Sequence, residues 1–311
     1  MSEFTRTVDG VTYLDETRLW AAVSTRATPV QARLREFLRL AGVKFFDEPE
    51  CNFVLQPLVA VTGFGGFPIS FDATTPEGHL VLNRATMTPT EIVAGFNNTM
   101  GRAGFYSYMN PGNHTPEAMN AVTTKHGHFS KAHTVTVDLA LLGYSAAIEG
   151  NLMILRRWFN HVGRLTNTRT LAQCDPPLVV MEPEDLSVAR AVRSAVAGIL
   201  SAQAPPKRGE MPGAQYQELL SDYYERVNGL WPNSRALILM VNAEMSNLRS
   251  TMPDIADKGQ EREQRRLLAM LNDTLRPLFP EMLKHSSEYG YEMPQHWPAR
   301  QAWEKKKGSP K

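Results

Sequence analysis

The sequence predicts an α+β protein (mixed α/β), in which helices predominate and a modest number of strands lie in the first half. Three observations predict this class. Residues 134–141 alternate apolar and polar side chains, as a half-buried strand does. Several later segments carry apolar residues at helical spacing. No internal repeat or low-complexity region is present that would indicate another architecture.

The composition is that of an ordinary globular protein, with 42% apolar and 21% charged residues in 311. Because 33 basic residues balance 32 acidic ones, no overall field attracts a nucleic acid polymer or an anionic membrane. The two cysteines, Cys51 and Cys174, are too few for a disulfide framework. No apolar run approaches the ~20 residues that span a bilayer. We therefore expect a cytoplasmic protein without membrane or nucleic acid partners.

The N-terminal section predicts two helices followed by short strands. A helical pattern over residues 16–40 is interrupted at residues 27–29 by Ala-Thr-Pro. Strand-like segments follow at residues 52–62 and 79–82. The glycine-rich residues 63–68 between them lack dinucleotide-loop and P-loop spacing, which favours a tight turn over a phosphate loop.

Helices dominate the remainder of the chain. Thr88 is a predicted cap, with Pro89 in the first turn and Glu91 at the capping-box position. Gly143 is expected to end the strand at residues 134–141, and Ser145 to cap the next helix. Further helices are predicted at residues 116–124, 145 to about 161, 184–203, 215–228 and 258–283, with a loop at 204–209.

A histidine cluster precedes the predicted strand, where residues 125–128 read Lys-His-Gly-His and His133 follows. Alternate histidines on a strand share a face and can bind a metal. No Asp, Glu or Cys completes a ligand set there, so capping and hydrogen bonding are favoured and no metal is expected. A nucleophile triad is also disfavoured, because the chain has no Gly-x-Ser-x-Gly elbow.

The most unusual segment is residues 156–170, where two arginines and a Trp-Phe pair end an apolar helix. An amphipathic core helix explains the apolar part without any ligand. The polar part beyond it carries Asn167, Thr168, Arg169 and Thr170. Amides and hydroxyls there can hydrogen-bond a base edge while an arginine grips a phosphate. Both interpretations remain open on these residues alone.

These segments together resemble the flavin-dependent thymidylate synthase family. Residues 125–133 resemble its His-Gly-His element, and residues 158–161 resemble its Trp-Phe-Arg-His stretch. Residues 167–170 resemble its Asn-Glu-x-Ser motif. Arg226 resembles its phosphate-binding arginine, and Val-Asn-Ala at 241–243 resembles the start of its last active-site helix.

Several motif positions depart from the family pattern. Arginines of the motif are replaced by Asn160 and Val162, and the arginine after Asn-Ala is replaced by Glu244. The motif's serine, glutamate and final arginine are replaced by Leu165, Thr168 and Ala172. Such departures suggest a specialised branch, similar to the PolB-type enzymes that methylate uridylate at C5 in polyoxin-type nucleoside antibiotic pathways.

The resemblance implies a particular fold and assembly. It implies a twisted, mainly antiparallel sheet flanked by helices, in a catalytic domain at residues 86–290. Residues 1–85 would be an N-terminal extension of unknown role, and residues 291–311 a C-terminal tail. The resemblance also implies a homotetramer whose active sites lie between subunits.

The implied reaction is reductive methylation of UMP, dUMP or both at C5. Methylenetetrahydrofolate would donate the carbon, reduced FAD the hydride, and NADPH would regenerate the flavin. Two alternatives are an ordinary thymidylate synthase acting on dUMP and a non-catalytic flavin- or nucleotide-binding scaffold.

The resemblance also implies roles for individual residues. Thr170 would be the catalytic hydroxyl that orients the base and polarises its ring. Substrate contacts are expected from Arg156, Arg157, Arg169, Thr170 and Arg226. Cofactor contacts are expected from His128, His133, Asn160, His161, Asn167 and Asn242.

Overall fold

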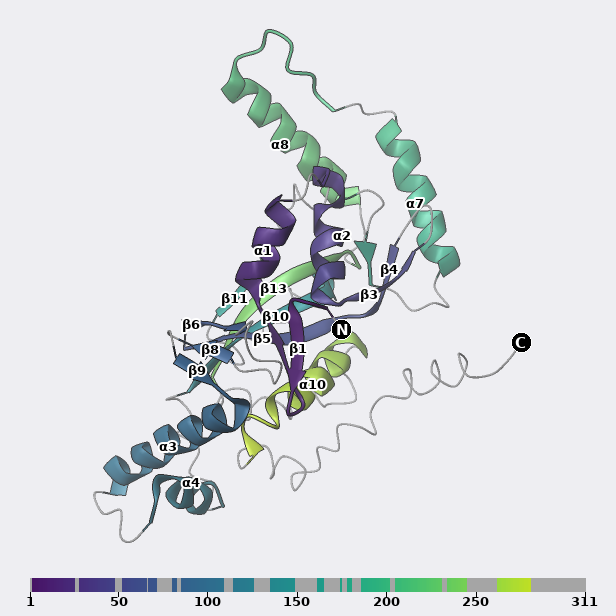
Figure 1. Ribbon diagram of the computed structural model, residues 1–311. Coiled ribbons are helices and arrows are strands. Elements are labelled where there is room, and N and C mark those ends of the chain that lie inside the picture. The colour runs from purple at the N-terminus through teal and green to yellow at the C-terminus, as the bar shows by residue number, and fades with distance from the viewer. Residues whose placement is uncertain are drawn as a thin grey trace.

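The computed structural model defines an α+β protein built on a mostly antiparallel sheet with helices on both faces (Figure 1). This class agrees with the sequence prediction. The structure describes residues 2–25, 28–47, 52–65, 67–71, 80–82, 85–108, 114–125, 135–148, 161–164, 174, 178–180, 186–201, 205–230, 234–244 and 262–280.

A seven-stranded sheet forms the centre of the described part of the chain, in the order β1-β2-β5-β10-β13-β11, with β6 paired to β5. β2 and β5 run parallel, and the other pairings are antiparallel. The strands are β1 Thr5–Val8, β2 Val11–Leu14, β5 Leu58–Phe64, β6 Phe67–Pro68, β10 Thr136–Ser145, β11 His161–Arg164 and β13 Ala236–Glu244.

Two small sheets flank the central one. The first has the order β12-β4-β3 and the second the order β7-β8-β9. Their strands are β3 Lys44–Asp47, β4 Asn52–Gln56, β12 Leu178–Val179, β7 Ser70–Phe71, β8 Leu80–Leu82 and β9 Ala85–Met87.

Helices cover both faces of the central sheet and extend from it as two arms (Figure 1). α1 Glu16–Thr25 and α2 Val30–Ala41 lie on one side, and α10 Arg262–Leu275 lies on the other, in contact with β2 and β5. One arm pairs α3 Pro89–Tyr108 with α4 Pro116–Lys125. The other consists of α7 Leu186–Ser201 and α8 Gly213–Leu230.

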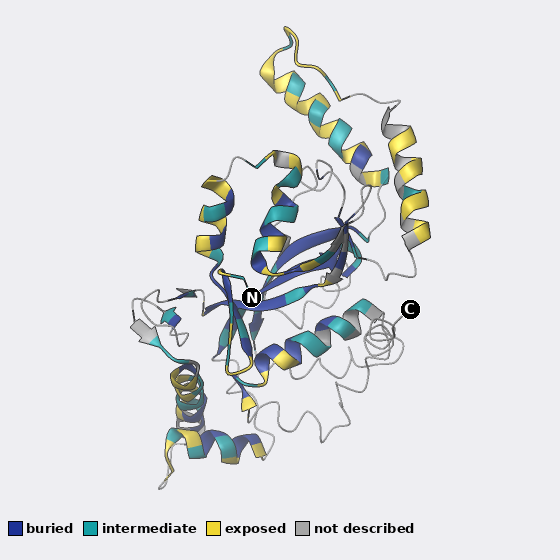
Figure 2. Ribbon diagram, turned by 45° about the vertical axis from the view of Figure 1, so that its right-hand side comes forward, coloured by how far each residue is buried: buried dark blue, intermediate teal, exposed yellow. Residues whose placement is uncertain are grey.

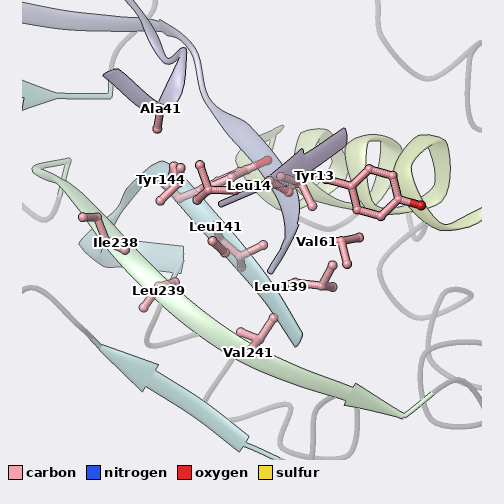
Figure 3. Packing of buried hydrophobic residues seen from close by; sticks show 14 of the residues in the cluster. Tyr13, Leu14, Ala41, Val61, Leu139, Leu141, Tyr144, Ile238, Leu239 and Val241 are labelled. Carbon is pink, nitrogen blue, oxygen red and sulfur yellow. The ribbon is translucent and has the colours of Figure 1, made fainter. Parts of the chain in front are cut away.

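The core lies where the central strands meet α10 and α2. Leu139 and Leu141 of β10 and Val241 of β13 are completely buried, as Figure 3 shows at close range. Burial of a leucine side chain contributes about 1.5–3 kcal/mol, so each of these leucines contributes substantially to stability. Figure 2 shows that buried residues are concentrated in the sheet and that much of α7 and α8 is not buried.

The start of α10 is attached to the end of β10 by hydrogen bonds. The Ser145 amide donates to Glu263 Oε1 at 2.7 Å, and the Ser145 hydroxyl bonds the other oxygen of the same carboxylate. The Tyr144 hydroxyl contacts Met270 Sδ at 3.1 Å, and burial raises the pKa of this phenol. These contacts fix α10 against one face of the sheet.

Several elements agree with the sequence predictions. At the start of α3, the Thr88 amide donates to Glu91 Oε2 at 2.6 Å, and the Glu91 amide donates to Thr88 Oγ1 at 3.3 Å. This is the expected capping box. The Ile148 amide donates to Ser145 Oγ at 3.3 Å, as expected for a capping serine. The predicted helices at 16–40, 116–124, 184–203 and 215–228 correspond to α1 and α2, α4, α7 and α8. The helix predicted at 258–283 corresponds to α10 but ends earlier, at Leu275, where turns follow.

The prediction that Gly143 ends its strand is wrong. β10 continues to Ser145 through a bulge, where Gly143 adopts a φ of 76° and the register shifts between Leu142 and Tyr144. Glycine allows this left-handed conformation at little cost, so the strand bends without stopping. Ala140, expected on the polar face, is buried because neighbouring strands and helices cover this half of β10 on both sides.

The resemblance implied that Asn242 lies at the start of a helix, and this expectation is also wrong. Asn242 lies in β13, in a run of residues that are mostly buried. A short apolar run is compatible with either a buried helix or a central strand, and pairing with β10 and β11 determines the strand.

The first 85 residues share the central sheet with the rest of the chain. They supply β1, β2, β5 and β6, and β5 pairs along β10 from Leu58 to Phe64. They therefore form one core with the later strands. The division into an extension, a catalytic domain at 86–290 and a tail at 291–311 stays a prediction.

Candidate functional site

Three strands bring polar residues from distant parts of the sequence into one line across the sheet. In the β-sheet register, Asp138 of β10 is opposite Asn242 of β13, and Asn242 is opposite His161 of β11. We call Asp138, Asn242 and His161 the cross-strand row. Cross-strand partners have Cβ atoms about 4.5–5.5 Å apart, so the row places these positions within reach of a single ligand.

The described side chains of the row are joined by a hydrogen bond. Asn242 Nδ2 donates to Asp138 Oδ1 at 2.6 Å. Both side chains are half-buried, and the backbone on the other side of Asp138 is that of Gly63, which carries no side chain. A charge-assisted bond of this kind is stronger than one between neutral groups. It therefore holds the amide in one orientation.

Glu16, at the start of α1, adds a second carboxylate near the row. Burial raises the pKa of the Glu16 carboxyl, a hydrogen bond from Trp20 lowers it, and the charge of Asp138 raises it. The Trp20 indole donates to Glu16 Oε1 at 3.2 Å. Because like charges resist ionising together, the carboxylate of Asp138 opposes ionisation of Glu16.

A further acidic residue lies two positions along β13 from Asn242. Thr136 of β10 is opposite Glu244 of β13. Negative groups therefore lie on both β10 and β13 next to Asn242. An uncharged ring with hydrogen-bonding edges suits this end of the sheet better than a phosphate does.

The chemistry available here is recognition by hydrogen bonding. Among the described residues, no group of three His, Cys, Asp or Glu side chains is arranged to hold a metal ion. The described side chains of the row offer one amide and one carboxylate. These groups can bind and orient a polar ring edge.

Two of the predicted cofactor residues, His161 and Asn242, are brought together by the backbone register. Arg226, a predicted phosphate contact, lies on α8 and not on the strands that carry the row. It is exposed near the end of α8, and its Nε bonds the Asp222 carbonyl at 3.4 Å. Since β13 begins at Ala236, Asn242 is roughly 20 Å along the strand from that end.

The other predicted site residues lie outside the described residues, so their roles remain predictions. They are His128, His133, Arg156, Arg157, Asn160, Asn167, Arg169 and Thr170.

Asp138 and Glu16 were not among the predicted site residues. Asp138 had a visible signal, since it is the only charged residue in the alternating segment at 134–141. Glu16 had no such signal, because an acidic residue in the first turn of a helix is ordinary.

Comparison with known proteins gives a structural likeness only. No family profile matches the sequence, and no curated protein is similar to it in sequence. A thymidylate synthase ThyX structure from Helicobacter pylori, with FAD and dUMP, is similar with a TM-score of 0.45 and 11% identity, over 60% of this chain and 91% of that chain. A UMP/dUMP methylase PolB structure from Streptomyces cacaoi, with 5-Br UMP, is similar with a TM-score of 0.44 and 10% identity, over 76% and 97%.

At these TM-scores and identities, the likeness does not assign the chain to a family. The described helices include none that is long and apolar enough to cross a membrane.

Proposed function

We propose that this protein catalyses flavin-dependent reductive methylation of a uracil nucleotide at C5. UMP, dUMP or both would be the substrate. The observation that carries the proposal is the backbone pairing of His161 with Asn242. The motif resemblance assigned both residues to one flavin site from segments far apart in the sequence, and the sheet register supports that assignment.

The proposed reaction balances without a protein nucleophile. The methylene carbon of methylenetetrahydrofolate would bond to C5 of the uracil while its bonds to the two folate nitrogens break. The proton lost from C5 and one proton from solvent would go to those nitrogens. When bound, reduced FAD supplies the hydride that converts the methylene to a methyl, and NADPH is the reductant for the flavin. Tetrahydrofolate and the 5-methyl nucleotide are the products.

The chain's own residues would bind and orient the reactants. Asn242 would bind a ring edge, and Thr170 would hold and polarise the pyrimidine. Arg169 and Arg226 would bind the nucleotide phosphate, with Arg226 supplied by a neighbouring subunit of a homotetramer. Positioning and a preorganised polar environment lower the barrier even where no covalent bond to the protein forms. A place in nucleoside antibiotic biosynthesis is part of this proposal.

The first test is the spectrum of the purified protein. A preparation that binds FAD with an oxidised-flavin spectrum is expected. A protein that takes up no FAD would contradict the proposal and favour a scaffold that kept the fold after losing motif arginines at Asn160 and Val162.

The second test is turnover. The protein is incubated with methylenetetrahydrofolate, NADPH and either UMP or dUMP, and the products are analysed by mass spectrometry. A gain of one methyl group on UMP supports the proposed branch. Methylation of dUMP alone would indicate an ordinary thymidylate synthase, and no methylation of either would contradict an enzymatic role.

Replacing Thr170 should impair turnover more than flavin binding. Thr170→Ala removes a hydroxyl that is expected to face the base, which should lower kcat by roughly 10- to 100-fold. Thr166→Ala is the matched control, since it removes a hydroxyl at a position where the family motif specifies no residue. Equal loss of turnover and FAD affinity in Thr170→Ala would contradict a base-facing role.

Replacing Arg226 should weaken nucleotide binding with little effect on FAD. Loss of a charge-assisted bond worth about 1.5–3 kcal/mol corresponds to roughly tenfold or more in Kd. Arg208→Ala, which removes another exposed arginine before α8, is the control. Unchanged nucleotide affinity in Arg226→Ala would remove this residue from the phosphate site.

A further inference from the structure

The arm formed by α7 and α8 presents apolar side chains that are exposed on both of its helices. We propose that this arm is the surface through which two copies of the chain associate, with the helices of one arm packing against those of the other. The inference deepens the proposed function and rests on it for one point only, the role of Arg226 at the site of a neighbouring subunit.

The exposed apolar residues of α7 form one stripe. Val188 is 55% exposed, and Ala191 and Ala195 are exposed as well. Residues three, four and seven positions apart lie on the same side of a helix. Val192, four positions after Val188, contacts Val227 of α8. The stripe therefore borders the contact between the two helices, and further helices laid on it would extend that apolar packing.

The second helix of the arm carries an exposed leucine beside the same contact. Leu219 is 40% exposed, and Tyr223, one turn further along α8, packs against Val227. Single exposed apolar residues are ordinary on a protein surface. Those on α7 and α8 differ because they border one shared contact, so together they form a continuation of it.

The arm has little core of its own. Among the described side chains of α7 and α8, Val227 is the one that is buried. Figures 1 and 2 show the two helices extending away from the central sheet. Most of the stability of a helix in a protein comes from packing an apolar face against other elements. Two helices with so small a shared core are therefore expected to gain stability from a further helical surface.

The distribution of charge favours a second copy of the chain as the occupant. The sequence of α7 contains Arg190 and Arg193 and no acidic residue. The exposed charged residues of α8 are mostly acidic: Glu218, Asp222, Glu225 and one arginine, Arg226. When two arms meet about a two-fold axis, α7 of each copy can face α8 of the other. Opposite charges then lie across the surface on both sides, which favours this pairing over other orientations.

Association through the arms has a consequence for the predicted phosphate contact. Arg226 is seven positions after Leu219, so the two residues lie on the same side of α8. A surface that covers Leu219 therefore brings Arg226 beside the neighbouring copy. This arrangement would let Arg226 serve the site of a partner subunit, although it lies away from the cross-strand row of its own chain.

The first experiment measures the molar mass of the full-length protein by size-exclusion chromatography with light scattering. The parent protein should be an oligomer. Val188→Asp places a charge in the apolar stripe, where it would be buried unpaired by a second arm, so the molar mass should fall by about half or more. Val122→Asp on α4, where the residue is 40% exposed, is the matched control and should keep the molar mass of the parent.

The second experiment detects the pairing of α7 with α8 between copies. Val188→Cys and Leu219→Cys are made in separate chains, which are expressed together and treated with a short thiol cross-linker. The mixture should give a covalent dimer beyond the background of the parent protein, because each introduced thiol would face the other across the arms. Val122→Cys expressed with Leu219→Cys is the control and should give no more dimer than the parent.

The results separate this inference from the proposed function. A monomeric parent protein, an unchanged molar mass in Val188→Asp, an equal loss in Val122→Asp, or no cross-link above background would each overturn the inference, while FAD binding and methylation could still be observed. A protein that associates through its arms but takes up no FAD would overturn the proposed function and leave this surface in place. Loss of association in Val188→Asp alone, together with the cross-link between α7 and α8, would support the inference.

Discussion

The central sheet and the arm formed by α7 and α8 differ in how firmly they are held. β10 and β13 are mostly buried and lie at the middle of one core. On α8, Val227 is buried against Val192, Tyr223 and Leu230, while much of the helix is exposed. Figure 2 shows this contrast directly. The sheet can thus hold a ring edge in a fixed geometry, whereas the predicted phosphate contact Arg226 belongs to a separate arm.

The largest difference between the two regions should appear in core truncation. Leu139→Ala removes a completely buried side chain and should lower the free energy of unfolding by about 2–5 kcal/mol. Leu219→Ala on α8, where the residue is 40% exposed, should cost less than about 1 kcal/mol. Denaturant unfolding measures both. Similar costs would contradict the contrast.

Glycine replacement should have opposite effects in the two regions. Gly143→Ala should destabilise the protein by about 1–2 kcal/mol, because φ is 76° and a Cβ would meet Val43 and Val54 at 3.1 Å. Gly229→Ala in α8 meets nothing within 4 Å and should stabilise by about 0.5–1 kcal/mol. Thermal unfolding of the two variants measures the signs. A stabilising Gly143→Ala would contradict the bulge.

The smallest effect should come from the carboxylate beside the row. Because the folded-state pKa of Glu16 is raised, its contribution to stability is present below the unfolded pKa and is lost as pH rises through the folded pKa. Glu16→Gln should therefore stabilise the protein at neutral pH, with the gain vanishing below about pH 4.

Unfolding curves across the pH range measure this effect. Glu117→Gln, an exposed acidic residue in the first turn of α4, is the control and should show no gain. An equal gain in stability in both variants would contradict the account that burial and the charge of Asp138 raise the pKa of Glu16.

Local signals in the sequence predicted the elements that local chemistry determines. The reciprocal bonds of Thr88 and Glu91 depend only on residues three apart, so the start of α3 could be read directly. The strand around Asp138 was visible from its alternation. Its extension past Gly143 was not, because the bulge depends on partners in β13.

The candidate site could be predicted only in part. The motif resemblance predicted His161 and Asn242 as site residues. The local sequence pattern could not predict that they occupy opposite positions on two neighbouring strands. Asn242 was expected at the start of a helix because Val-Asn-Ala at 241–243 resembles that element of the family, whereas it lies in β13. Register is a property of paired strands, and it also revealed Asp138. Sequence reasoning therefore found residues, while the fold supplied their geometry.

The cross-strand row is tested most directly by the FAD affinity of Asn242→Ala, measured by equilibrium titration beside the parent protein. The variant should bind FAD about tenfold more weakly, with a thermal midpoint within about 3 °C of the parent. Equal affinity in the two proteins, or no binding of FAD by the parent, would contradict a ligand site on the row.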